Sequence, residues 1–182
     1  MHYHRGAQGL SRLTAGLSPL AMSTACLHDG AHDDALEGAG LSAALADAER
    51  RIVADGERLT APRRRVLELL LGASGPVKAY DLMAEFGAGG PPAKPPTVYR
   101  ALDFLSRQGL AHRIESLNAY VACRSSDPAH AAAFLICDCC GSVVEAEWDL
   151  GVQTDAAARE HGWDLRRLSV EARGLCSACR GV

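Results

Sequence analysis

Two Cys-x-x-Cys motifs in the C-terminal half, Cys137 to Cys140 and Cys176 to Cys179, constrain the fold of this chain more than any other feature. Two residues between cysteines allow a tight turn in which both thiolates face one ion, and Gly141 lets the chain turn back after the first pair. Two such turns complete a tetrahedral shell of four thiolates, which is typical of structural zinc. The sequence therefore predicts a zinc that ties a strand of this half to a later segment; buried cysteines without metal are the alternative.

One further cysteine complicates the first motif, because Cys137-x-Cys139 is also a possible pair. In an extended segment neighbouring side chains point to opposite faces. We therefore expect Cys139 to face away from the site that Cys140 serves.

The expected compartment decides how seven cysteines are interpreted. The chain has no apolar run of roughly 18 residues, the length that a membrane-spanning helix needs. No sustained apolar stretch follows Arg5 and Arg12, so a signal peptide is not expected. We predict a cytoplasmic protein, and in the reducing cytosol clustered cysteines bind metal more often than they form disulfides.

Positive charge is concentrated in the middle of the chain, although the formal net charge is −3. Residues 59–110 carry seven basic and four acidic side chains, whereas residues 1–58 and 111–182 are each net acidic. The whole-chain charge hides this basic segment, so it does not exclude nucleic acid as a partner.

The first two thirds of the chain have the pattern of a winged helix-turn-helix. Apolar residues at helical spacing predict helices over 41–55, from Thr60 to about residue 71, over 78–86 and from a Thr97 cap to 108. Residues 111–123 then alternate around a polar turn at Asn118-Ala119, which predicts a hairpin.

The remaining chain predicts a small α/β unit, with strands at 133–137, 142–148 and 164–171 and a helix at about 150–161. The fold class is therefore α+β. Residues 1–40 lack periodicity and are predicted to be mostly disordered. We divide the rest into a winged-helix domain, 41–123, and a zinc-binding domain, 124–182.

Residues suited to DNA lie in and around the last helix of the winged-helix domain. Arg side chains reach guanine edges in the major groove, and Tyr and Lys reach phosphates and base methyls. The alternative is an ordinary solvated face, and Tyr80 suits packing as well as phosphate contact. The cluster of Arg at 63–65 suits backbone phosphates. The candidate DNA-binding residues are Tyr80, Lys94, Thr97, Tyr99, Arg100, Arg63 and Arg64.

A second group of metal-binding side chains, His112, Cys123, His130 and Glu145, is spread along the chain. Spacing does not group these residues, and each alone is more often structural than a ligand. Their positions in the predicted fold favour a shared metal site. His112 and Cys123 lie at the two ends of the predicted hairpin. His130 and Glu145 lie in the junction and the next sheet. A metal held by all four would bridge the two domains, as a metal-operated switch requires.

Several segments together resemble the ferric uptake regulator family, most closely its zinc uptake regulator branch. The resemblance covers roughly residues 41–180. It is carried by the segments AKPPTVYRALDFL (93–105), AYDL (79–82), QGLAH (108–112), ESLNAYVAC (115–123), FLICDCCG (134–141) and GLCSAC (174–179).

The resemblance implies a homodimer in which residues 124–182 form the dimerisation domain. It implies a structural zinc on Cys137, Cys140, Cys176 and Cys179. It also implies a regulatory zinc on His112, Cys123, His130 and Glu145, two zinc ions per subunit in all. Tyr80 and Arg100 match family positions implicated in DNA contact.

The function implied is that of a zinc-responsive transcriptional repressor, which binds inverted-repeat operator DNA when the regulatory zinc is bound and represses zinc-uptake genes. An iron-, manganese- or peroxide-responsive repressor of the same family is the alternative. A thiolate beside imidazoles and a carboxylate favours zinc, since iron(II) and manganese(II) prefer harder ligands. A zinc hydrolase would keep a water position open. Because Glu145 fills that position, we do not expect an enzyme.

Overall fold

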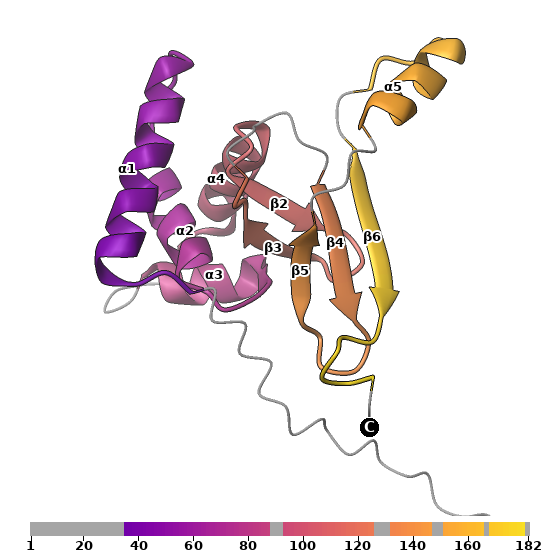
Figure 1. Cartoon of the computed structure of the whole chain (residues 1–182). Coiled ribbons are helices and arrows are strands. Elements are labelled where there is room, and N and C mark those ends of the chain that lie inside the picture. The colour runs from indigo at the N-terminus through magenta and orange to yellow at the C-terminus, as the bar shows by residue number, and fades with distance from the viewer. Residues whose placement is uncertain (1–34, 88–92, 126–131, 147–150, 166–167, 181–182) are drawn as a thin grey trace, which may run out of the picture.

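The computed structural model describes residues 35–87, 93–125, 132–146, 151–165 and 168–180. Figure 1 shows the N-terminal helices on one side, a hairpin in the middle and the C-terminal sheet with its helix on the other side. The α+β class is confirmed. No helix in these ranges is long and apolar enough to cross a membrane. Most of the segment predicted to be disordered, residues 1–34, lies outside the described residues.

The helical half contains α1 (Gly38–Ala54), α2 (Ala61–Leu71), α3 (Ala79–Phe86) and α4 (Pro95–Arg107). Each helix buries one apolar stripe, as the spacing predicts, and these stripes meet in one core. Fully buried side chains of that core include Ile52, Val66, Leu82, Val98 and Leu105. The helix α1 begins three residues before the expected start at Leu41.

The helix α4 begins earlier than its sequence pattern predicts. Lys94, and not Thr97, is the capping residue, and Pro95 opens the helix. A proline fits the first turn because it lacks the amide hydrogen, and the amides of the first turn have no carbonyl partner within the helix. Gly109 follows the helix with a φ of +64°, a conformation that glycine adopts without strain.

The predicted hairpin forms the wing, from β2 (Ala111–Ile114) and β3 (Ala119–Ala122). Asn118 closes its turn with a φ of +47°. A short strand that the sequence pattern did not predict, β1 (Val77–Lys78), pairs with β3, so the sheet order is β1-β3-β2. Two residues are too few to show a strand periodicity.

The C-terminal sheet contains β4 (Ala132–Cys137), β5 (Val143–Ala146) and β6 (Ser169–Gly174), in the order β5-β4-β6, and α5 (Gly151–Glu160) connects β5 to β6. The predicted strand at 164–171 was wrong in position, since β6 ends three residues later. Its position follows from parallel pairing with β4, from Ala132–Ser169 to Cys137–Gly174. A partner strand so distant in sequence leaves no local signal.

One face of the C-terminal sheet packs against the wing. Phe134 at its centre pairs with Glu145 on β5 and with Glu171 on β6. Directly paired residues point to the same face, so these three side chains form one row across the sheet. Phe134 and Ile114 of the wing are fully buried in the same apolar cluster. The wing therefore lies between two cores, one helical and one on this sheet.

Candidate functional site

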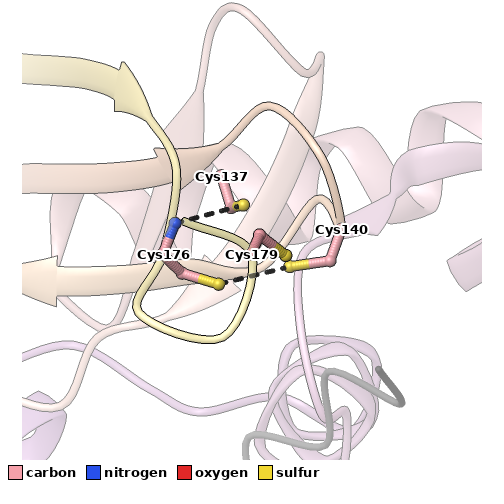
Figure 2. A group of neighbouring side chains, drawn as sticks. All are labelled: Cys137, Cys140, Cys176 and Cys179. Carbon is pink, nitrogen blue, oxygen red and sulfur yellow. Dashed lines mark hydrogen bonds between the residues drawn. The ribbon is translucent and has the colours of Figure 1, made fainter. Parts of the chain in front are cut away.

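Four cysteines meet where β4 and β6 end side by side. Cys137 ends β4, and its strand partner Gly174 ends β6, so Cys176 follows close by. The backbone amide of Asp138 donates to the carbonyl oxygen of Gly174 at 2.8 Å and holds the two strand ends together. Figure 2 shows that the side chains of these two residues and those of Cys140 and Cys179 turn toward one another. Their sulfur atoms all lie within 4.8 Å of each other.

The spacing of these sulfur atoms fits tetrahedral zinc. The Sγ atoms of Cys140 and Cys176 are 3.8 Å apart. Two thiolates that each lie about 2.3 Å from a tetrahedral zinc are separated by about 3.8 Å. Cys139 is exposed and lies outside the cluster, as expected, although residues 138–140 form a turn and not the extended segment on which the expectation was based.

The environment of the four thiols is uneven. Backbone amides, that of Cys176 at 3.4 Å foremost, stabilise the thiolate of Cys137 and lower its pKa. Burial and the neighbouring cysteines raise the pKa of Cys179. Because the pKa of Cys179 is raised, only a bound cation allows all four side chains to be thiolates at neutral pH.

A second group lies between the wing and the C-terminal sheet. His112 comes from β2, Cys123 directly follows β3, and Glu145 comes from β5; their ligand atoms lie within 4.8 Å of one another. Nε2 of His112 is 3.1 Å from Oε1 of Glu145, and both side chains are largely buried. The other oxygen, Oε2, accepts a hydrogen bond from the backbone amide of Arg124 at 3.3 Å. The carboxylate is thus oriented from both sides.

The hairpin explains why His112 and Cys123 meet. His112 pairs with Val121, and Cys123 is two residues beyond Val121, so all three side chains share a face. The ring of Phe134 supports the imidazole edge-on, with 5.8 Å between the ring centroids. Burial, and secondarily the charge of Glu145, raises the pKa of Cys123 to about 11. Without a cation this thiol is therefore protonated at neutral pH.

The three side chains offer nitrogen, sulfur and carboxylate oxygen, a ligand set that suits zinc better than iron(II) or manganese(II). His130, the remaining residue of the predicted set, lies outside the described residues. The structure therefore brings together three of the four predicted residues and leaves the fourth untested.

The predicted recognition surface lies on α4 and α3. Tyr80 and Tyr99 are 78% and 52% exposed, which is unusual for such large rings. Lys94 and Arg100 are also exposed, and within the described ranges no ion pair engages either of them. Thr97 is half-buried in the first turn of α4.

The arginines of α2 are engaged within the molecule. The guanidinium of Arg63 lies over the ring of Phe104, 3.3 Å from its centroid, and donates to the carbonyl oxygen of Arg58. Arg64 forms ion pairs with Glu49 and Glu68, at 3.4 and 3.5 Å. A role for these two arginines at DNA phosphates stays a prediction.

Comparison with known proteins places these features in one family. The sequence model of the ferric uptake regulator family matches residues 54–173, and the chain belongs to this family. The zinc uptake regulation protein of Escherichia coli (strain K12) is 46% identical over 138 residues, which cover 74% of this chain and 80% of the relative. The resemblance inferred from the sequence motifs is confirmed.

Two solved structures extend the likeness to three dimensions. A zinc uptake regulator complexed with zinc and DNA is 43% identical, covers 79% of this chain and 97% of its own, and has a TM-score of 0.71. Holo XcZur is 42% identical, covers 76% of this chain and 97% of its own, and has a TM-score of 0.68.

Proposed function

We propose that this chain is a zinc-responsive transcriptional repressor that binds operator DNA as a homodimer when its regulatory zinc is bound, and so represses zinc-uptake genes. The observation that carries the proposal is the second ligand group, whose members come from the wing and from the C-terminal sheet. The similarity to a zinc uptake regulation protein, and to a regulator solved with zinc and DNA, supports it. Such a repressor acts on DNA in the bacterial cytoplasm.

We assign two zinc ions to each subunit. The four cysteines hold the structural ion, and their closed shell leaves no position for a substrate. His112, Cys123 and Glu145 hold the regulatory ion, with His130 as the proposed fourth ligand. A bound zinc supplies bonds of fixed length and angle at this second site.

The regulatory ligands act by joining two parts of the chain. When His112 and Cys123 of the wing share an ion with Glu145 of the sheet, the wing is fixed on the sheet. The recognition helix α4 packs on the same core as the wing, so its direction is fixed as well. The affinity for zinc must be higher in the DNA-competent arrangement than in the other arrangements, because equal affinity would shift no population.

The homodimer is supported by the outer face of the C-terminal sheet. Leu135 and Val144 on this face, and Leu175 just beyond β6, are 43–55% exposed. Apolar side chains gathered in this way mark association surfaces. A two-fold dimer presents two copies of α4 to half-sites about 34 Å apart, which requires an inverted-repeat operator.

Metal titration tests the function against its alternative. We expect operator binding to increase with free zinc and not with iron(II) or manganese(II) at comparable concentrations. A protein that bound its operator only with iron(II) or manganese(II) would show that the chain is a different sensor of the same family.

Replacement of Arg100 by alanine is expected to weaken operator binding about 10- to 100-fold, the usual effect of losing one base-contacting arginine. The zinc content of the protein is expected to stay unchanged. Arg107 on the same helix is the matched control, because it pairs with Asp103 in the last turn. Fluorescence anisotropy of labelled operator measures both variants, and equal affinities for Arg100→Ala and the parent protein would remove Arg100 from the interface.

Zinc affinity at the regulatory site is expected to rise with pH. Because the pKa of Cys123 is about 11, its thiol must release a proton before the sulfur can bind zinc at any lower pH. The apparent affinity therefore increases about tenfold for each pH unit in this range. Competition with a chelator at pH 7.5 and 8.5 measures the change, and a flat profile would show that Cys123 is not a ligand. The Cys123→Ser variant is expected to lose this dependence.

A further inference from the structure

The carboxylate of Glu171, on β6, contacts the turn of the wing. Its Oε1 accepts a hydrogen bond from the backbone amide of Glu115 at 2.7 Å, and its Oε2 accepts one from the amide of Ser116 at 3.1 Å. The two partners are 56 and 55 residues away in the chain, so this contact joins the two domains. Both oxygens are used, and hydrogen bonds to an ionised acceptor are about twice as strong as neutral ones.

The carboxylate remains ionised at neutral pH. Partial burial alone would raise the pKa of Glu171, but the hydrogen bonds from Ser116 and Glu115 outweigh this effect and lower it. The turn thus receives a full negative charge directly at two of its amides.

The position of Glu171 mirrors that of Glu145. Both residues pair with Phe134, one from each side, and both point toward the wing. Glu145 lies against His112 and Cys123 at the base of the hairpin, whereas Glu171 lies at its turn. Between His112 and Glu115 the strand advances three residues, or about 10 Å. The wing is therefore attached to the sheet at two points, with Phe134 and Ile114 packed between them.

We propose that Glu171 is a positioning residue of the zinc switch: it attaches the wing turn to the C-terminal sheet and completes, with the metal ligands, a two-point attachment that sets the direction of the recognition helix. With the attachment at the base alone, only apolar packing such as that of Ile114 on Phe134 opposes rotation of the wing about the metal site, and the second attachment restricts this rotation further. The inference rests on the proposed function, because the direction of α4 matters only if the protein binds an operator.

Attachment at Glu171 and zinc binding assist each other. The regulatory ligands of the wing and of the sheet meet only when the wing is docked, so any contact that favours docking raises the apparent zinc affinity. Glu171→Gln is therefore expected to require about tenfold more free zinc for half-maximal operator binding, within the usual range of coupling between sites.

The direction of the effect separates this role from simple charge. Replacing a glutamate by glutamine removes a negative charge, which by itself would strengthen binding to DNA. Weaker operator binding by Glu171→Gln is thus the opposite of the electrostatic expectation. Glu115→Gln is the matched control, since its exposed carboxylate in the same turn pairs only with Arg113 among the described residues while its amide still reaches Glu171. We expect this control to keep the parent zinc response.

The test uses the full-length, zinc-loaded dimer. Operator binding is measured against buffered free zinc for the parent, Glu171→Gln, Glu171→Asp and Glu115→Gln, and hydrogen exchange of residues 113–118 is followed by mass spectrometry. We expect Glu171→Gln to shift the zinc midpoint about tenfold and to speed exchange of the turn amides, with an intermediate effect for Glu171→Asp. An unchanged midpoint together with unchanged exchange would overturn the proposal.

Failure of the proposed function has a different signature. If operator binding by the parent protein did not respond to zinc, the repressor proposal would fail, whereas hydrogen exchange would still decide whether Glu171 holds the turn. Zinc content and the oligomeric state are measured for every variant. If Glu171→Gln lost the structural zinc or the dimer, Glu171→Asp would supply the deciding measurement.

Discussion

Replacement of Cys176 by serine is expected to unfold the C-terminal sheet and to abolish the dimer. The four-cysteine site joins the ends of β4 and β6, and the loss of one thiolate opens its closed shell. Structural zinc contributes about 10–16 kcal/mol to folding in small zinc domains. This contribution is as large as the entire stability of a typical domain, roughly 5–15 kcal/mol. Zinc analysis, circular dichroism and analytical ultracentrifugation measure the loss of metal, structure and dimer together.

Cys139→Ser is the matched control for this experiment. Cys139 lies in the same turn as Cys140 but is exposed and outside the cluster. Under reducing conditions we expect the control to keep its zinc, its dimer and its melting temperature. A Cys176→Ser protein that kept both zinc ions and its thermal transition would show that the four cysteines are not a structural site.

Replacement of Cys123 by serine is expected to leave the fold intact and to remove the zinc response. A serine hydroxyl does not ionise at neutral pH, so the regulatory site loses its sulfur ligand and keeps only the carboxylate of Glu145 as an anionic ligand among the described residues. We expect one zinc per subunit to remain, in the four-cysteine site. Operator binding at a free-zinc concentration that saturates the parent protein is expected to fall about 100-fold, at the upper end of allosteric coupling.

Operator binding across a series of buffered zinc concentrations measures this change, with Cys139→Ser again as the control. Full zinc dependence in Cys123→Ser would contradict the assignment of the regulatory site. Loss of the dimer in the same variant would show instead that Cys123 stabilises the fold.

The helices were predictable because their signal is local. Val98, Leu102 and Leu105 recur at helical spacing, and all three are buried in the structure. The strands of the C-terminal sheet were less predictable, because the position of β6 is set by pairing with its parallel partner β4 and not by its own sequence pattern. The start of α4 was misplaced by three residues because Thr97 was taken as its cap in place of Lys94, although Pro95 fits the first turn of a helix.

The two candidate metal sites differ in the same way. Each half of the four-cysteine site is a short motif, so its spacing alone indicates the chemistry. Glu145 shares no spacing with His112, and only its place in the sheet, opposite Phe134, brings it to the wing. Glu171 was missed because a carboxylate that binds backbone amides more than 50 residues away has no counterpart in a local pattern.

The parallel pairing of β4 and β6 gives the proposed structural zinc a role beyond stability. A strand that slips by one residue turns every side chain to the opposite face. Such an error in β6 would point Glu171 away from the wing, and it would also carry Cys176 away from Cys137. The four thiolates can surround one ion only when β4 and β6 pair in this register, so metal binding favours the correctly paired sheet. The proposed structural zinc thereby also fixes the strand register on which the contact of Glu171 with the wing depends.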